Sequence, residues 1–295
     1  MSVLSYCDVS GRRLTRFTAE VGSGEVVGVV GPRAAGKTEL LRLAAGLARP
    51  RAGVVGGVGH SPTSCTARGL VGYTPDPPAV PRELTGVEWL RYVASHRAGT
   101  PAVRERLLHD ALEVSGLGDL AGRPVGGYAR GPLQQLSVAA ASLGDRRLLL
   151  LDEPLAGLDP DAAAHLRAGF ARLAAEGRAL VIVSNDLHGI ERLATRTLVL
   201  AGGRLVADLA TARLLGERVA ELSLNGGALR AAGWLLARFS GAMRTGDGVA
   251  VPLVDGLTVE QVLTACRSQR IPVAASRVRY RLLEDLLQEV THPPR

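Results

Sequence analysis

Gly31-Pro32-Arg33-Ala34-Ala35-Gly36-Lys37-Thr38 is a complete match to the phosphate-binding loop pattern G-x-x-x-x-G-K-[ST]. In such a loop, backbone N–H groups surround the phosphates and the lysine reaches the β- and γ-phosphates. Lys37 is the single lysine among the 35 Lys and Arg residues of the chain. A compact ammonium fits inside a ring of amides, whereas a planar guanidinium is too wide to lie there. The loop therefore predicts binding of a nucleoside triphosphate.

The residues on either side of the loop favour a strand–loop–helix unit. Residues 25–30 form a short apolar run typical of a buried strand, and residues 39–47 carry apolar side chains at helical spacing. This order brings the loop amides and the positive end of a helix dipole to one point, which suits an anion. The context argues against the alternative, a chance match in a chain with 36 glycines.

A second apolar run ends in two acids. Residues 148–151 are all leucine, and Asp152 and Glu153 follow them. A strand buried on both faces ends at the carboxyl edge of a parallel sheet, where ligands bind. We expect Asp152 to hold Mg²⁺ with the Thr38 hydroxyl, because this cation prefers oxygen ligands. Glu153 would orient or deprotonate the attacking water. The alternative is an acidic helix N-terminus, which is a common pattern.

Composition limits the class of protein. A chain of 295 residues holds one large domain and a small one, and 46% hydrophobic with 3% aromatic residues predicts a core of Leu, Val and Ala. Cys7, Cys65 and Cys266 lie too far apart to suggest a metal site or a disulfide framework, which fits a reducing compartment. The absence of a long apolar stretch and of a signal-peptide pattern predicts a soluble, cytoplasmic protein. The net charge of +7 comes from scattered arginines, which favours a solvated surface and leaves an anionic partner as the alternative.

Hydrophobic periodicity predicts an alternating α/β order. Strands are expected at 25–30, 69–73, 148–152 and 179–184, and in a hairpin of 198–200 with 204–206. Helices are expected at 39–47, at 85–118 with a break at Pro101, and at 133–143, 162–175 and 187–194. The pattern restarts near 212–220 and continues as strand, helix, a hairpin at 245–248, helix, strand and helix.

Together these motifs resemble the ATP-binding subunits of ABC transporters over nearly the whole chain. The matching segments are the phosphate loop, the apolar run with its two acids at residues 148–154, and four segments that resemble family loops. These are residues 71–76 for the Q-loop, 128–136 for the signature, 156–160 for the D-loop and 184–186 for the H-loop. The tail, with 282–287 before 290–291, resembles the small C-terminal module of the drug-exporter branch.

The resemblance implies an α/β fold of the P-loop NTPase class. It implies an ABC-type ATP-binding domain over 1–212, with a helical subdomain at about 82–143, and a small α+β accessory domain over 213–295. It also implies ATP and Mg²⁺ as cofactors, a separate membrane permease as partner, and a homodimer or a heterodimer with another ATP-binding subunit. The chain would act at the cytoplasmic face of the cell membrane and drive export, with ATP hydrolysis that is weak or confined to a complex.

The same resemblance assigns roles to individual residues. Catalytic roles fall to Glu153, Asn185 and Asp76, and metal-binding roles to Thr38, Asp152 and Asp76. Nucleotide contacts are expected from Gly31, Pro32, Arg33, Ala34, Ala35, Gly36, Lys37, Thr38, Glu39, Ala129, Arg130, Gly131 and Asp159. Asp159 belongs to the D-loop, which contacts the other subunit in the family.

Several of these positions depart from the family pattern. Asp76 replaces the Q-loop glutamine, Ala129 the signature serine, Arg130 the first signature glycine and Asn185 the H-loop histidine. Directly after Thr38, Glu39 replaces the hydroxyl residue that is usual in the family, and within the loop Ala34 replaces a glycine. The Arg130 side chain should obstruct the approach of the signature backbone to the γ-phosphate of the partner's nucleotide, although its guanidinium could contribute charge instead.

His188 is a conceivable substitute for the missing H-loop histidine, and a solvated helix residue is the simpler interpretation. Upstream of the phosphate loop, Tyr6 is the one candidate for an aromatic residue that stacks on the nucleotide base, and its position in the sequence fits that role poorly.

Two other functions remain in view. The departures favour a regulatory module that binds ATP and scarcely hydrolyses it, paired with an intact ATP-binding partner. A soluble relative acting on nucleic acid usually has two ATP-binding domains in one chain, and this chain has one phosphate loop. Few aromatics and dispersed arginines also disfavour a stacking surface, so no nucleic acid partner is expected.

Overall fold

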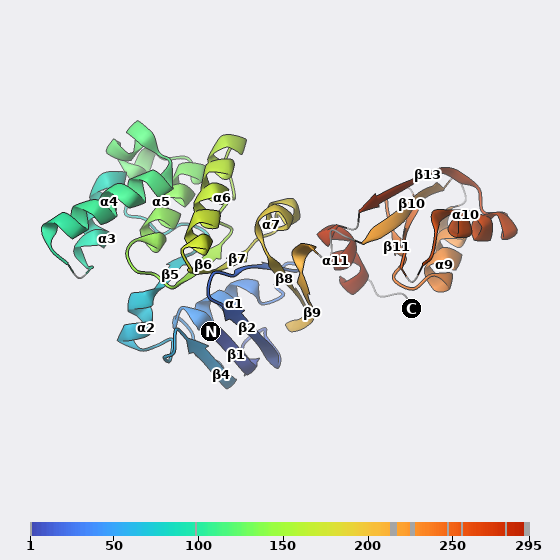
Figure 1. The fold of residues 1–295 in the computed structure, drawn as a ribbon, viewed down its shortest axis with the longest axis horizontal. Helices are drawn as coiled ribbons and strands as arrows, with labels where there is room; N and C mark the ends of the chain where they lie inside the picture. The colour runs from blue at the N-terminus through green and yellow to red at the C-terminus, as the bar shows by residue number, and fades with distance from the viewer. Residues whose placement is uncertain are drawn as a thin grey trace. The chain divides into compact units, whose positions relative to one another are not determined.

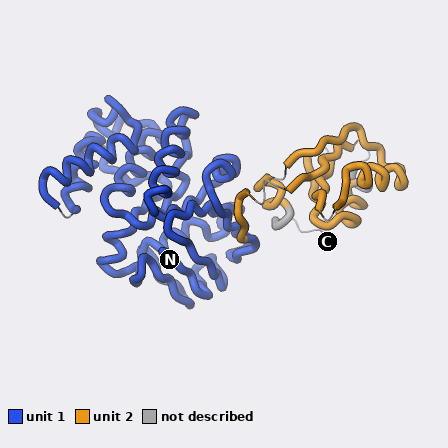
Figure 2. The backbone as a smooth tube through the Cα atoms, in the orientation of Figure 1, with its two compact units in different colours: residues 1–207 blue, residues 208–295 orange. Residues whose placement is uncertain are grey.

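The computed structural model describes residues 2–97, 99–212, 217–224, 228–246, 248–254, 256–280 and 282–291. The chain divides into two compact units, Met1–Ala207 and Asp208–Arg295 (Figure 2). The domain boundary predicted between residues 212 and 213 falls a few residues after this division.

A six-stranded sheet forms the centre of the first unit. Its order is β5 (Val71–Thr74), β6 (Leu148–Asp152), β7 (Ala179–Val183), β3 (Val26–Val30), β8 (Arg196–Ala201) and β9 (Arg204–Ala210). The first five of these strands pair in parallel. Every residue of β3, β6 and β7 is buried, as expected for strands covered on both faces. The carboxyl ends of β3, β6 and β7 therefore lie at one edge of the sheet.

A second, antiparallel sheet covers the helix that follows the phosphate loop. Its order is β2 (Phe17–Gly22), β1 (Ser2–Ser10) and β4 (Ala52–Gly57), and α1 (Lys37–Ala44) contributes Leu40 and Leu41 to the shared core. Tyr6 is buried there: its ring meets Phe17 edge-on and its hydroxyl donates to the Leu40 carbonyl at 3.0 Å. This packing makes Tyr6 a core residue and excludes it as a base-stacking platform.

Helices gather at the other end of the first unit (Figure 1). They are α3 (Gly86–Ser95), α4 (Pro101–Ser115) and α5 (Arg130–Ser142), with short 3₁₀ turns at Gly118–Gly122 and Val125–Gly127. Thr85 and Glu88 form a capping box at α3, and Thr100 caps α4 with Pro101 in its first turn. The predicted break at Pro101 therefore separates two helices. Leu90, Leu108 and Leu136 join them in one core.

The strand predicted at 69–73 was placed two residues too early. The strand expected from Gly69 begins at Val71, because a short helix, α2 (Cys65–Leu70), precedes it. The Ser64 side chain accepts a hydrogen bond from the Ala67 amide and so starts that helix. The helices α6 (Pro160–Ala175) and α7 (Leu187–Leu193), which are capped by Asp159 and Asp186, complete the unit.

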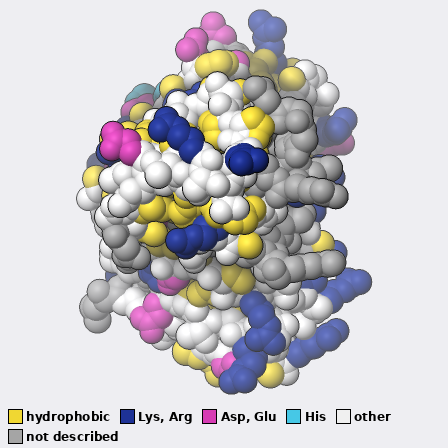
Figure 3. All heavy atoms as spheres, turned by 90° about the vertical axis from the view of Figure 1, so that its right-hand side faces the viewer, with side chains coloured by type: hydrophobic (Ala, Val, Ile, Leu, Met, Phe, Trp, Pro, Cys, Tyr) yellow, Lys and Arg dark blue, Asp and Glu magenta, His cyan; other side chains and the backbone are white. Residues whose placement is uncertain are grey.

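The second unit is a four-stranded sheet with helices. Its elements are β10 (Arg218–Leu224), α9 (Ala228–Arg238), β11 (Met243–Arg244), β12 (Gly248–Pro252), α10 (Val259–Ser268), β13 (Val273–Tyr280) and α11 (Leu283–Thr291). The sheet order is β11-β12-β10-β13. The strand–helix–hairpin–helix–strand–helix order agrees with the sequence pattern, and Asp247 of the predicted turn lies outside the described residues. Basic side chains occur at several separate places on the face shown in Figure 3, among uncharged and hydrophobic ones.

Candidate functional site

The phosphate loop joins β3 to α1 and closes around Lys37. The Lys37 ammonium donates to the carbonyls of Gly31 at 2.6 Å and Pro32 at 3.1 Å, and to Asn185 Oδ1 at 3.2 Å. These acceptors match the three donors of an ammonium. Burial lowers the pKa of Lys37, while the carboxylates of Glu153 and Asp152 act in the opposite direction. The cation is thus held where β3, β6 and the residues after β7 converge.

The loop contains one residue in an unfavourable backbone conformation. Ala34 has φ +66°, in the left-handed region that glycine adopts without strain. Gly36, at φ +104°, immediately precedes α1 and keeps its glycine. A Cβ at Gly36 would lie 2.7 Å from a Leu14 methyl carbon. The glycine at 36 is therefore required both by the backbone and by packing, while Ala34 carries a local strain.

Asp152 ends β6 beside the first turn of α1. It is buried, which raises the pKa of its carboxyl, and a hydrogen bond from the Thr38 side chain acts in the opposite direction. The charge of Asp76 also raises the pKa of Asp152, so these carboxylates are within electrostatic reach of each other. The structure therefore brings together the three residues predicted to bind metal.

Glu153 is held by the segment that follows β7. Its carboxylate accepts hydrogen bonds from Ser184 Oγ at 3.0 Å, from the Asn185 amide at 2.9 Å and from Asn185 Nδ2. Burial raises its pKa, and these hydrogen bonds oppose that shift. Its backbone lies in the left-handed region at φ +48°, which is uncommon for residues other than glycine. The side chain is fixed in one direction.

Asn185 connects the cation to this carboxylate. Its side chain accepts from Lys37 through Oδ1 and donates to Glu153 through Nδ2. One amide supplies both functions because it carries an acceptor and a donor. His188, by contrast, is exposed on α7. Lys37, Glu153 and Asn185, which are distant in sequence, thus form one connected group.

The altered residues Asp76 and Arg130 contact each other. Arg130 Nη2 lies 2.9 Å from Asp76 Oδ1, with the Arg130 side chain 57% exposed and that of Asp76 26% exposed. The Arg130 side chain also lies over Gly157, since a Cβ built there would be 3.4 Å from three of its carbons. Ala129 sits at the N-cap of α5 without a side-chain hydrogen bond. Arg130 therefore joins the segment after β5 to the segment after β6.

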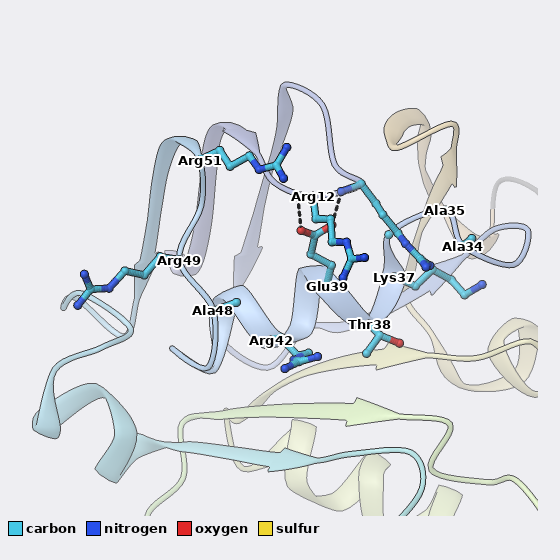
Figure 4. A pocket seen from close by; sticks show the side chains of 12 residues that line it. Arg12, Ala34, Ala35, Lys37, Thr38, Glu39, Arg42, Ala48, Arg49 and Arg51 are labelled. Atoms are coloured by element: carbon cyan, nitrogen blue, oxygen red, sulfur yellow. Dashed lines mark hydrogen bonds between the residues drawn. The ribbon is translucent and has the colours of Figure 1, made fainter.

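An arginine-lined pocket of about 510 Å³ adjoins the loop. Figure 4 shows Arg12, Arg42, Arg49 and Arg51 spread around it, and Arg13 also lines it. Among the described residues, no hydrogen bond or ion pair is made by these five side chains. Glu39 is engaged elsewhere: its carboxylate accepts from the main-chain N–H groups of residues 12, 13 and 14. Glu39 thus anchors the loop before β2.

Comparison with known proteins identifies the family. The family model described as ABC transporter matches residues 14–156. A fluoroquinolones export ATP-binding protein of Mycobacterium tuberculosis (strain CDC 1551 / Oshkosh) is 33% identical over 219 residues, which are 72% of this chain and 71% of the relative. The chain belongs to the ABC transporter family. It is an ATP-binding subunit of that family.

Other relatives agree with this assignment. An uncharacterized ABC transporter ATP-binding protein of Nostoc sp. (strain PCC 7120 / SAG 25.82 / UTEX 2576) is 32% identical over 67% of this chain, and the match spans 60% of that relative's length. A solved ATP binding subunit of an ABC transporter is 28% identical with a TM-score of 0.67, covering 72% of this chain and 91% of that one. The α/β P-loop NTPase fold is therefore confirmed. No helix in the described part of this ABC subunit combines the length and hydropathy needed to cross a membrane.

The remaining predicted nucleotide-binding residues of this ABC subunit occupy three places. Arg33 and Ala35 lie in the loop with Ala34, and Gly131 lies in the first turn of α5, where a Cβ would approach the Gly157 carbonyl oxygen to 2.6 Å. Asp159 accepts a hydrogen bond from the Ala162 amide at 2.8 Å and so caps α6. Its contact with a second subunit stays a prediction.

Sequence reasoning missed two groups of residues. Gln134 is fully buried on α5 and donates to the Asp152 carbonyl at 3.2 Å, which links the signature helix to the end of β6. Its polar side chain inside an apolar helix was the available signal. The pocket arginines were also missed, although Arg12 and Arg13 form a basic pair just before the strand-like residues of β2.

Proposed function

We propose that this ATP-binding subunit hydrolyses ATP and drives export through a separate membrane permease. The observation that carries the proposal is the convergence of Lys37, the Thr38–Asp152 pair and Glu153 at the carboxyl edge of one sheet. The mycobacterial relative is a fluoroquinolones export ATP-binding protein, and this similarity supports export as the direction of transport. ABC ATP-binding cassettes dimerise and work with membrane permease subunits, so we place the chain at the cytoplasmic face of the membrane, bound through its permease.

Each residue of the connected group has a defined task in hydrolysis. Lys37 would exchange its carbonyl acceptors for β- and γ-phosphate oxygens inside the amides of 31–38. Glu153 would accept a proton from the attacking water, whose oxygen bonds to the γ-phosphorus as the bond to the β-phosphate oxygen breaks. Asn185 keeps the Glu153 carboxylate oriented by donating to it. The raised pKa of Glu153 makes the carboxylate a stronger base than an ordinary glutamate.

The donor set of this site fits Mg²⁺. Thr38 and Asp152 offer a hydroxyl and a carboxylate that already meet, with Asp76 nearby. The described residues contain no cluster of three or more His, Cys, Asp or Glu side chains that would hold a metal alone. This agrees with a magnesium ion that takes its other ligands from phosphate and water. The ion would neutralise charge between the β- and γ-phosphates.

The base end of the nucleotide would enter the arginine pocket. Tyr6 is buried, so the guanidinium planes of this pocket replace an aromatic ring as stacking surface. We therefore assign these arginines to the bound nucleotide and propose no nucleic acid partner for them.

The altered residues favour a second candidate function, an ATP-binding regulatory subunit with little hydrolysis. In a family-type dimer, each nucleotide lies between the phosphate loop of one subunit and the signature of the other. A homodimer would place Ala129 and the Asp76-paired Arg130 at both sites. In a heterodimer with an intact partner, nucleotide on Lys37 would meet a normal signature, and hydrolysis there would persist. The ion pair between Arg130 and Asp76 is the observation that favours this candidate.

Turnover by the complex distinguishes the two candidates. The permease is sought in the adjacent reading frame, and ATP hydrolysis by the purified complex is measured for wild type and Glu153→Gln. Catalysis predicts that the variant loses about 10²-fold or more in turnover while still binding ATP, since the base is removed and the loop is intact. Equal, near-zero turnover in both proteins would support the regulatory candidate and contradict hydrolysis at Lys37.

A further inference from the structure

A second pocket, of about 190 Å³, lies among the end of β5, α3 and α5. Pro75, Val80 and Val93 contribute apolar side chains to its wall, and Arg97 and Arg146 are its two charged residues. No aspartate or glutamate lines it. It is smaller than the 300–1,000 Å³ typical of drug-sized ligands. Its size therefore suits a few heavy atoms and not a nucleotide.

Three buried hydrogen-bond donors of this pocket have no partner. Across the described residues, five buried side-chain polar atoms lack a hydrogen bond, and three of them are Trp89 Nε1, Arg97 Nε and Arg146 Nε. All three residues line the pocket: Trp89 and Arg97 come from α3 and the residues just after it, and Arg146 comes from the segment before β6. A buried donor left unpaired costs about 1–3 kcal/mol, so native proteins rarely leave several together. Their concentration in one small pocket indicates a missing acceptor.

The two arginines differ in how they are held before any ligand binds. Arg146 is only 9% exposed, and its Nη1 donates to the carbonyls of Arg68 at 2.7 Å and Gly69 at 2.8 Å. Arg97 runs past Gly144, and its side chain makes no hydrogen bond or ion pair within the described residues. Burial lowers the pKa of Arg97 because it disfavours the charged form. The Trp89 indole is stacked on Tyr92, with ring centroids 5.7 Å apart.

We propose that this pocket binds a carboxylate carried on a short apolar stem, with Arg97, Arg146 and the Trp89 indole as donors. A guanidinium matches the planar pair of oxygens of a carboxylate, and the indole N–H adds a third donor. The apolar wall accommodates the methylene groups that precede the carboxylate. A free organic acid and an acidic side chain of another polypeptide share this chemistry. The proposal is independent of ATP hydrolysis.

The pocket adjoins a segment of the nucleotide site, so a bound ligand would affect that site over a short distance. Pro75 lines the pocket and is followed directly by Asp76, which is paired with Arg130. A ligand in the pocket would therefore contact the residue next to Asp76.

Trp89 fluorescence tests the proposal in the full chain. The sequence has two tryptophans, and the substitution Trp234→Phe leaves Trp89 as the single one. The probes are N-acetyl-glutamate amide, its neutral match N-acetyl-glutamine amide, sodium acetate and inorganic phosphate. We expect the glutamate probe to shift Trp89 emission saturably and the glutamine probe to leave it unchanged. Equal affinity for acetate would assign the site to free acids, and preference for the glutamate probe would assign it to an acidic side chain.

Arg97→Gln should weaken the glutamate response at least tenfold. The matched control is Arg91→Gln, an exposed arginine of α3 that does not line the pocket, and it should leave the response unchanged. Circular dichroism confirms that each variant is folded, and Arg146 is left intact because it supports residues 68 and 69. A response to glutamine or phosphate equal to that for glutamate, no response at all, or full binding by Arg97→Gln would overturn the proposal.

Discussion

The two halves of the nucleotide site differ in how their side chains are held. At the phosphate end, Lys37, Asp152 and Glu153 are at least half-buried and each is hydrogen-bonded. At the signature end, Ala129 offers no hydroxyl, and Arg130 is largely exposed and paired with Asp76 in its own subunit. We infer from this difference that ATP binding and ATP hydrolysis are separable in this chain. In our proposal the phosphate end holds the triphosphate, whereas Arg130 at the signature end is engaged in an internal ion pair with Asp76.

The largest expected effect comes from restoring the signature end. Ala129→Ser with Arg130→Gly returns a hydroxyl donor and clears the backbone approach to a partner's γ-phosphate. Because one lost donor of this type typically costs about 10²–10³ in rate, we expect ATP turnover of the homodimeric complex to rise tenfold or more. ATP affinity of the isolated subunit serves as the control and should stay unchanged, since Lys37 is untouched. A double variant no faster than wild type would show that the signature end does not limit turnover.

Removing the Glu39 carboxylate should destabilise the phosphate end. Glu39→Ala deletes the acceptor for three main-chain N–H groups of the loop before β2. We expect the free energy of unfolding to fall by about 1–2 kcal/mol, measured by urea denaturation. Glu105→Ala is the matched control, because Glu105 is an exposed helical glutamate of α4 without a side-chain bond in the described structure. Equal losses in both variants would contradict an anchoring role for Glu39.

A smaller effect is expected from relieving strain in the loop. Ala34→Gly should stabilise the fold by about 1 kcal/mol, because φ +66° is unfavourable for alanine and open to glycine. The neighbouring Ala35 is absent from the positive-φ positions, so Ala35→Gly should destabilise the fold by a similar amount. Thermal unfolding of both variants is the measurement. Stabilisation by both substitutions, or by neither, would contradict the strain assigned to residue 34.

The smallest expected effect concerns the ion pair of the signature end. A double-mutant cycle with Asp76→Asn and Arg130→Gln should give a coupling energy of at most about 1 kcal/mol, falling as salt is added, because the pair is partly exposed. Such a weak pair is easily exchanged when a nucleotide binds. A salt-independent coupling above that value would mean that the pair locks the segment after β5.

The fold and the phosphate end could be predicted because local patterns specify them. Four leucines before Asp152 and a glycine loop before an apolar helix predict a buried parallel sheet with its ligand site at the carboxyl edge. Tyr6 was correctly doubted as a stacking residue. The sequence could not reveal that Arg130 meets Asp76 across 54 residues, because a pair of charges has no local period. For the same reason, neither the Glu39 anchor nor the three convergent donors of the small pocket could be found from spacing alone.

Nucleotide affinity at Lys37 tests the account most directly. Equilibrium binding of ATP with Mg²⁺ is compared between wild type and Lys37→Ala, with folding of the variant confirmed by its unfolding transition. The account predicts that wild type binds ATP despite its altered signature and that the variant loses at least 10²-fold in affinity. Equal binding by both proteins, or none by wild type, would contradict the claim that the intact phosphate end holds the triphosphate.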